Sequence, residues 1–220
     1  MAGVENYHRR TADLLRPHVG ELANYQDPST LFLTCADSRL VPNLITSSGP
    51  GDLFTVRNVG NVVGRPGTDA ATDAALEFAV AKLSVESLVV CGHSGCGAMT
   101  ALLDGGDGGQ GPIDVWLEQS RASLAAFRNG HPVQGAAAAA GFSPVDQLAM
   151  VNVAVQLERL QDHPSVAGVV QAGTVQLTGL FYDIPTARVL QVTANGIGHL
   201  HPLPGPAGAP EPVAAGAGNA

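Results

Sequence analysis

The stretch from Ser87 to Gly97 reads SLVVCGHSGCG. Its first five residues are a short, almost continuous apolar run, which is typical of a buried β-strand over residues 87–91. A glycine-rich turn follows, and a helix is expected over about residues 96–103. Strands that are apolar along their whole length, rather than alternating, indicate a parallel sheet that is covered on both faces.

The same pattern recurs earlier in the chain. Residues 31–35 (LFLTC) and 53–56 (LFTV) are further short apolar runs bounded by turn residues, and residues 69–83 show the spacing of a helix with one apolar face. Strands alternating with helices predict an α/β fold with a mostly parallel central sheet flanked by helices. In such sheets the chemistry lies at the carboxyl ends of the strands.

The rest of the chain completes one domain, expected over residues 1–201. A helical arm over residues 4–24 precedes the first strand and is free to lie on a neighbouring subunit. Residues 202–220 are rich in Pro, Gly and Ala and predict a disordered tail. The remaining expected elements are helices near 113–127 and 144–162, and a strand or hairpin within 174–192.

Composition excludes several classes of protein. Of 220 residues, 45% are hydrophobic and 14% charged, which is too apolar for a disordered chain. With 11 Lys and Arg against 19 Asp and Glu, the net charge is −8, and no basic run exceeds Arg9-Arg10, so no nucleic-acid partner is expected. No stretch has the length and apolarity of a membrane span or of a signal peptide, so we expect a cytoplasmic protein without a membrane segment.

The three cysteines, Cys35, Cys91 and Cys96, are an odd number in a chain for which no secretion signal is expected, so a disulfide framework is not predicted. Cys35 ends one expected strand, and His93 and Cys96 follow another. Two thiolates and one imidazole suit Zn²⁺, and three protein ligands leave a fourth position open, as in catalytic zinc sites. The plainer alternatives are a helix-capping role for His93 and simple burial for a cysteine, which is our reading of Cys91.

Asp37 and Arg39 follow Cys35 closely in the sequence CADSR. An aspartate and an arginine at this spacing can form a charge-assisted pair beside the metal and orient a zinc-bound hydroxide. Alternatively, Asp37 is an ordinary helix N-cap and Arg39 an ordinary surface charge.

The segments CADSR and CGHSGCGAM together resemble the β-class carbonic anhydrases, whose zinc ligands lie in C-x-D-x-R and H-x-x-C motifs. The resemblance covers roughly residues 5–195, including GPGDLFTVRNVGNVV and LTGLFYD. It implies a β-carbonic-anhydrase-like fold, with one zinc ion per subunit bound by Cys35, His93 and Cys96. It also implies that Asp37 and Arg39 are the catalytic pair.

The resemblance further implies a substrate pocket formed by Gln26, Phe54, Val59 and Phe78. Gln26 would bond the substrate, and Phe54 and Val59 would form apolar walls. Phe78 stands where many members have a tyrosine, so a hydroxyl is missing. As apolar residues, Phe54, Val59 and Phe78 would serve equally well in a core.

The implied reaction is the reversible hydration of carbon dioxide to bicarbonate and a proton, in a homodimer or tetramer whose subunits exchange N-terminal helices. The pocket would then lie at the subunit interface, with Gln26, Phe54 and Phe78 contributed by different chains. Two alternatives stay open. One is hydrolysis of carbon disulfide or carbonyl sulfide, and the other is a non-catalytic zinc module that regulates a fused or associated anion transporter.

Overall fold

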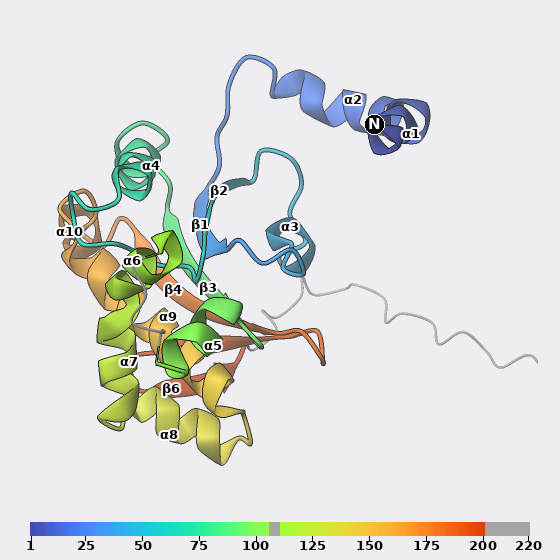
Figure 1. Ribbon diagram of the computed structural model, residues 1–220. Coiled ribbons are helices and arrows are strands. Elements are labelled where there is room, and N and C mark those ends of the chain that lie inside the picture. The colour runs from blue at the N-terminus through green and yellow to red at the C-terminus, as the bar shows by residue number, and fades with distance from the viewer. Residues whose placement is uncertain (106–110, 201–220) are drawn as a thin grey trace, which may run out of the picture.

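The computed structural model describes residues 1–105 and 111–200. One mixed sheet of six strands forms its centre, in the order β2-β1-β3-β4-β5-β6 (Figure 1). The pairs β1–β2, β1–β3 and β3–β4 are parallel, whereas β4–β5 and β5–β6 are antiparallel. The strands are β1 (Thr30–Cys35), β2 (Leu53–Asn58), β3 (Ser87–His93), β4 (Gln176–Asp183), β5 (Arg188–Thr193) and β6 (Gly196–His199).

Strands β1 and β3 lie side by side in the sheet because both are apolar along nearly their whole length. Every residue of each strand after the first is buried. Their register pairs Thr34 with Cys91, so the carboxyl ends of the two strands meet at one edge of the sheet. This edge is where the sequence predicts the metal site.

Helices connect the strands and cover mainly one face of the sheet. Those N-terminal to β3 are α1 (Ala2–Arg10), α2 (Ala12–Glu21), α3 (Pro42–Ile45) and α4 (Ala70–Ala81). Those C-terminal to it are α5 (Gly97–Leu103), α6 (Pro112–Leu117), the 3₁₀ turn η1 (Glu118–Ser120), α7 (Arg121–Arg128), α8 (Pro132–Ala139), α9 (Pro144–Asp162) and α10 (Ala167–Gln171).

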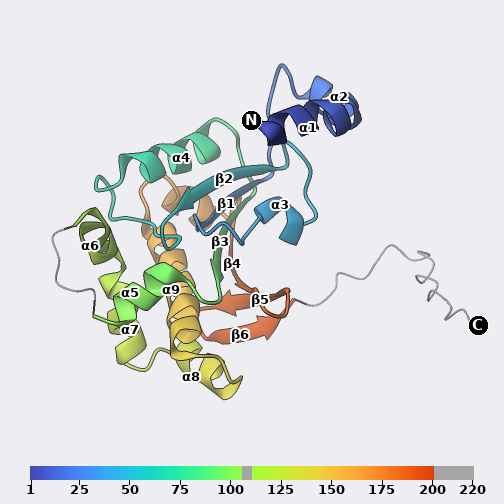
Figure 2. The ribbon, with the colours of Figure 1, turned by 45° about the vertical axis from the view of Figure 1, so that its right-hand side comes forward.

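Helix α9 is the main support of the sheet and is buried over most of its length (Figure 2). It approaches β3 and β4 closely because both strands carry a glycine beneath it. A Cβ atom on Gly92 would lie 2.9 Å from Val153, and one on Gly179 would lie 2.8 Å from Leu157. Only residues without a Cβ atom allow this contact, and Gly92 directly precedes His93.

The opposite face of the sheet has a smaller core. Phe32, Leu40, Val89, Cys91 and Leu180 form a buried cluster there, separate from the large cluster under α9. Cys91 is fully buried in it as a free thiol, and burial raises its pKa to about 12. A thiol in this environment is inert packing material, as expected from the sequence.

The α/β fold, its mostly parallel sheet and its N-terminal helical arm are confirmed. The strands expected at 31–35, 53–56 and 87–91, the helices at 69–83, 96–103 and 144–162, and a hairpin within 174–192 are all present. The expected tail, residues 202–220, lies outside the described residues, as do residues 106–110. No helix in the described ranges is long and apolar enough to cross a membrane.

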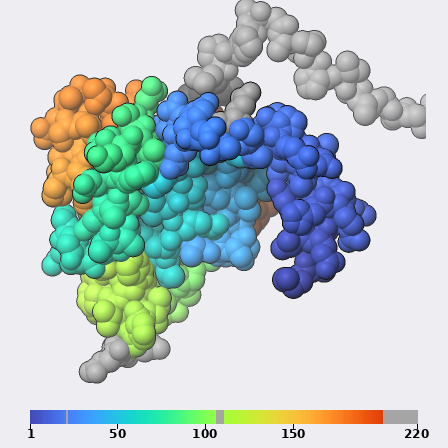
Figure 3. Space-filling view, turned by 90° about the horizontal axis from the view of Figure 1, so that it is seen from above, coloured from blue at the N-terminus to red at the C-terminus, as the bar shows by residue number. Residues whose placement is uncertain are grey.

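Two expected helices are divided differently. The arm is two helices rather than one over 4–24: α1 ends at Arg10 and α2 begins at Ala12, with Thr11 between them at φ −115°. The arm projects from the body of the subunit, and no residue of α1 is buried (Figures 1 and 3). The helix expected near 113–127 is α6, η1 and α7 in succession.

Candidate metal centre

Three potential metal ligands converge where β1 and β3 end. Cys35 is the last residue of β1, His93 is the last residue of β3, and Cys96 directly precedes α5. Their donor atoms lie within 4.8 Å of one another, and the two sulfur atoms are 4.0 Å apart. In the described part of the chain this is the one group of three His, Cys, Asp or Glu side chains with metal-binding spacing.

The turn between the second and third ligands depends on Gly95. This residue has φ +60°, a conformation that glycine adopts without strain. The turn brings Cys96 back beside His93. Its backbone is fixed by Asp146 near the start of α9, whose Oδ1 accepts the Gly95 N–H at 2.7 Å, and by Ser94 Oγ, which accepts the N–H of Ile184 at 2.9 Å.

The imidazole of His93 is oriented as a metal ligand. Its Nδ1 lies 3.0 Å from the carbonyl oxygen of Ser94, and a proton on Nδ1 makes this a hydrogen bond. Its Nε2 is buried, points toward the cluster and has no hydrogen-bond partner among the described residues. An unpartnered buried nitrogen is costly in a folded protein, whereas a metal ion at this position would satisfy it.

The two thiols share a buried, polar environment. The Cys96 thiol, His93 and the backbone N–H of Gly60, 3.3 Å from Cys35 Sγ, stabilise a thiolate at Cys35 and lower its pKa. The neighbouring Cys35 sulfur and burial raise the pKa of Cys96. Burial lowers the pKa of His93, but its contact with the Cys35 thiolate outweighs this effect and raises it. A divalent cation would bind both sulfurs as thiolates.

Asp37 and Arg39 form the ion pair that their spacing allows. Arg39 donates Nε to Oδ1 at 2.9 Å and a terminal nitrogen to Oδ2 at 2.8 Å, a bidentate arrangement. These hydrogen bonds hold the pKa of Asp37 well below its usual range. Arg39 also bonds the carbonyl of Gly95 at 3.1 Å, and Asp37 Oδ2 lies 3.8 Å from His93 Nε2.

The other expected residues are not gathered at this centre within one chain. Phe54 pairs with Leu31 at the beginning of β1, four residues and about 13 Å from Cys35 along the strand. It stacks on Phe78 of α4, with ring centroids 5.9 Å apart. Gln26 is exposed and precedes β1, so it also lies toward the amino end of that strand.

Val59 is the exception among the expected pocket residues. It follows β2 directly and is 41% exposed, near the strand end at which Cys35 pairs with Asn58. Its carbonyl accepts the indole N–H of Trp116 at 2.7 Å, which ties the segment after β2 to α6.

Arg57 supports the centre, although the sequence pattern does not single it out. Its guanidinium donates to the carbonyl oxygens of Cys35, Asp37 and Leu40 at 2.6–3.1 Å and so fixes the loop that carries the ion pair. The arginine lies about 20 residues along the chain from the loop, on a different strand. No local spacing rule reveals such a contact.

A buried polar network supports the centre from the other side. Asn152 of α9 donates to the carbonyl of Gly60 at 3.0 Å, and Gln156 accepts the N–H of Val63 at 2.9 Å. Ser123 of α7 donates to Asn152 Oδ1 at 2.8 Å. The network therefore holds the segment whose Gly60 N–H contacts Cys35. Polar residues on the buried face of an apolar helix are the sequence signal that could have suggested it.

Comparisons with known proteins agree with this geometry. The family model described as carbonic anhydrase matches residues 30–189. A carbonic anhydrase of Pseudomonas aeruginosa is 41% identical over 170 residues, which cover 76% of this chain and 74% of that protein.

Solved structures give the same result. The β-carbonic anhydrase CcaA has a TM-score of 0.76 at 30% identity, covering 86% of this chain and 84% of that one. A tetrameric β-carbonic anhydrase of Sordaria macrospora has a TM-score of 0.72 at 30% identity, covering 87% and 93%. With its fold, its Cys-His-Cys cluster and the matched segment all in agreement, this chain belongs to the β class of the carbonic anhydrase family.

Proposed function

We propose that the protein catalyses the reversible hydration of carbon dioxide to bicarbonate and a proton, at a zinc ion held by Cys35, His93 and Cys96. One observation carries the proposal: the ion-paired carboxylate of Asp37 lies 3.8 Å from the unpartnered His93 Nε2, beside the three-donor cluster. Two thiolates and an imidazole suit zinc, and a set of three protein ligands leaves one position for water or substrate.

Held by these three residues, zinc would lower the pKa of water and so supply the nucleophile near neutral pH. Asp37 then acts through its ionised carboxylate, which can only accept hydrogen bonds. It would accept a hydrogen bond from this nucleophile and direct the lone pair of the nucleophile at the carbon of carbon dioxide. Arg39 keeps this carboxylate ionised and fixes its direction, because it holds both oxygen atoms.

The test is stopped-flow carbon dioxide hydration on zinc-loaded protein, with the zinc content of each sample measured. Asp37→Ala should keep its zinc and lose turnover sharply, because the three ligands are intact. Equal turnover in Asp37→Ala and wild type would contradict the role of the carboxylate. The same preparations are also assayed with carbon disulfide, so that hydration of carbon dioxide can be distinguished from hydrolysis of carbon disulfide.

A matched pair of cysteine variants tests the ligand set. Cys96→Ala should lose the metal, whereas Cys91→Ala should retain it, because Cys91 lies in the small core on the opposite face of the sheet. Zinc retained by Cys96→Ala at the wild-type level would contradict the ligand assignment.

We further propose that the working unit is a homodimer, or a tetramer formed by two such dimers. The position of three expected pocket residues supports this proposal. Gln26, Phe54 and Phe78 lie toward the amino end of β1, away from the metal ligands of the same chain. The exposed arm of α1 and α2, which directly precedes the segment of Gln26, is available to contact a second subunit. The tetrameric Sordaria relative is a precedent for assembly.

Mixing two inactive variants tests this arrangement. Gln26→Ala lacks a pocket residue and Cys96→Ala lacks the metal, so neither homodimer should be active. In a dimer that combines them, one site has both the metal and an intact Gln26 from the other chain. Refolding the two variants together should restore about a quarter of the wild-type activity, since about half of the dimers are mixed and each has one complete site. No recovery in confirmed mixed dimers would place the whole pocket within one chain.

A further inference from the structure

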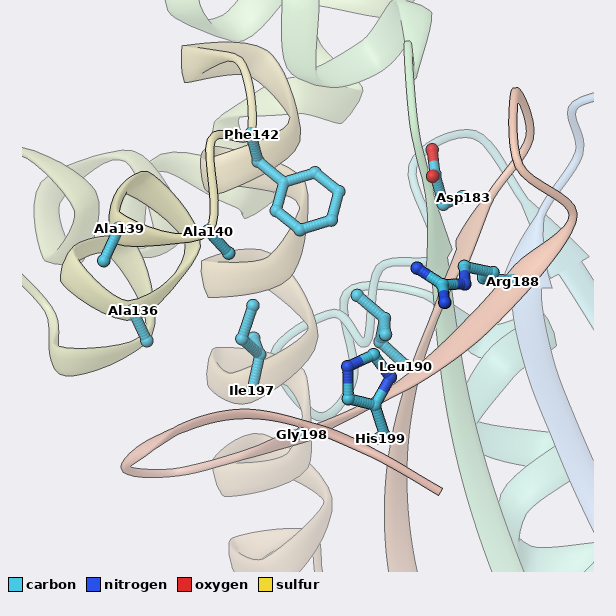
Figure 4. A pocket seen from close by; sticks show the side chains of 10 residues that line it. All are labelled: Ala136, Ala139, Ala140, Phe142, Asp183, Arg188, Leu190, Ile197, Gly198 and His199. Atoms are coloured by element: carbon cyan, nitrogen blue, oxygen red, sulfur yellow. The ribbon is translucent and has the colours of Figure 1, made fainter. Parts of the chain in front are cut away.

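A cavity of about 500 Å³ lies between α8 and the hairpin of β5 and β6 (Figure 4). None of the residues that line it is a metal ligand or belongs to the Asp37–Arg39 pair. Its walls are mostly apolar, formed by Ala136, Ala139, Ala140, Phe142, Leu190 and Ile197.

The cavity exists because the side chains of α8 are short. The helix reads PVQGAAAA, so the alanines that face the hairpin leave the space between the elements unfilled. Side chains alternate between the two faces of the β5–β6 hairpin, and this alternation determines which of them lie opposite α8. Residues 188 and 190 of β5 and residues 197 and 199 of β6 share one face of the hairpin, the face that lines the cavity.

Two basic side chains lie together on this mostly apolar surface, which Asp183 also lines. Arg188 and His199 come from neighbouring strands, and both point into the cavity (Figure 4). Among the described residues, Arg188 makes no ion pair, although its strand partner across the sheet is Asp183. The carboxylate of Asp183 instead accepts a hydrogen bond from the hydroxyl of Thr186.

We propose that this cavity binds a small organic carboxylate with an apolar body, such as an arylalkanoate. The carboxylate would accept two parallel hydrogen bonds from the guanidinium of Arg188 and a third from the imidazole of His199. The apolar body would lie against the alanines of α8 and the ring of Phe142. A mostly apolar cavity with a few convergent polar groups is the usual form of a small-molecule site.

The site is distinct from the metal centre but borders it. Asp183 at its rim precedes Ile184, whose N–H is bonded to Ser94 beside the ligand His93. Carboxylates also coordinate metal ions, so a test has to separate binding in the cavity from binding at the metal. Variants within the cavity do so, because they leave the metal ligands untouched.

The probe is 3-phenylpropionate, titrated into zinc-loaded protein and followed by calorimetry and by ligand-observed NMR. Wild type should bind it with a dissociation constant of about a millimolar or below. Ala140→Leu fills the cavity, and Arg188→Gln removes the main donor, so each should weaken binding by about tenfold or more. Ala138→Leu is the matched control, because Ala138 is an exposed residue of the same helix that does not line the cavity. It should bind as wild type does.

Charge gives a second criterion. The cation 2-phenylethylamine has a similar apolar body and should not bind beside Arg188 and His199. The proposal is overturned if wild type shows no binding at millimolar 3-phenylpropionate, or if binding is unchanged in both Ala140→Leu and Arg188→Gln. It is also overturned if azide, a small anion that coordinates zinc, abolishes binding, because the carboxylate then lies at the metal. Circular dichroism shows whether each variant is folded. If Ala140→Leu does not fold, Arg188→Gln alone tests the proposal.

Discussion

Replacing Asn152 with alanine removes one of the contacts by which α9 supports the metal centre. The Asn152 side chain is fully buried and makes three hydrogen bonds: it donates to Gly60 O at 3.0 Å, and it accepts from Ser123 Oγ at 2.8 Å and from Gln156 Nε2 at 2.9 Å. Alanine provides none of them. Gly60 then loses its bond to α9, whereas Val63, three residues later, keeps its bonds to Gln156 and Arg159 of the same helix.

The expected loss of stability follows from the groups left behind. Gly60 loses a donor, and Ser123 and Gln156 each lose an acceptor, in a region without exposed surface. A buried polar group without a partner costs about 1–3 kcal/mol. Because the hydroxyl and the amide can still bond each other at 3.2 Å, we expect the free energy of unfolding to fall by about 2–5 kcal/mol.

The expected effect on the metal is separate from the effect on stability. Gly60 N–H donates to the sulfur of Cys35, so a displaced Gly60 leaves this thiolate with one hydrogen bond fewer. Groups that orient metal ligands typically contribute about 10–100-fold to metal affinity. We therefore expect Asn152→Ala to bind zinc more weakly by about this factor, measured by competition with a chromophoric chelator. Urea unfolding of the zinc-free protein measures the stability.

Ser123→Ala is the matched control. It removes a hydroxyl from the same network but leaves the bond between Asn152 and Gly60 in place, so it should cost stability and leave zinc affinity unchanged. If Asn152→Ala is destabilised yet binds zinc as tightly as wild type, the segment is held by other contacts and the reasoning is wrong. An equal loss of affinity in both variants would also refute it, because the effect would then be a general loosening of the core.

Three further outcomes are expected. In Arg39→Gln the pKa of Asp37 should return toward its ordinary value of about 3.9. A carboxylate whose pKa is lowered in the folded state stabilises the protein above a pH of about 4, and this stabilisation is lost in more acidic solution. The variant should therefore lose less stability than wild type between about pH 4 and pH 2. Urea midpoints measured against pH test this. Gly179→Ala would place a Cβ atom 2.5 Å from the carbonyl oxygen of Val192 and should cost about 1–3 kcal/mol in thermal unfolding, whereas Gly135→Ala, with no atom within 4 Å, should cost nothing. Removing the metal with a chelator should lower the unfolding temperature of wild type, because an ion that binds only the folded state stabilises it by mass action.

The gathering of the metal ligands could be predicted because it depends on local patterns. Cys35 and His93 each end an apolar strand, and adjacent parallel strands bring their carboxyl ends together whatever the rest of the fold. The spacing of Asp37 and Arg39 likewise allows a bidentate pair within one short loop. These features need no knowledge of distant contacts.

Other elements lack such a pattern. Helix α8 is almost entirely alanine and glycine after Val133 and Gln134, so it has no clear apolar face; it forms because alanine favours helix and Pro132 suits the first turn. Strand β6 contains two glycines in four residues, which hides the alternation of Ile197 and His199. It is a strand because β5 offers a free edge beside it, which is a tertiary effect.

The supports of the metal centre could not be predicted for a related reason. Arg57 acts on backbone carbonyls about 20 residues away, and Asn152 on one that is 92 residues away. A carbonyl oxygen exists at every residue, so the sequence carries no mark of which one is used. The separation of Phe54 from the metal ligands of its own chain also depends on strand register, which the residues 53–56 alone do not reveal.

The dependence of the centre on α9 sets an order of events during synthesis. All three ligands have been translated by residue 96, but Asp146, which fixes the turn before Cys96, comes 50 residues later, and the helix that contains it ends at Asp162. At about 5–20 residues per second, several seconds separate the last ligand from its support. During this interval the nascent chain displays two thiols and an imidazole without the scaffold that fixes them. We expect the ribosome-bound chain to acquire a firmly held metal only after α9 has emerged, so nascent chains stopped before and after this helix should differ in zinc retention.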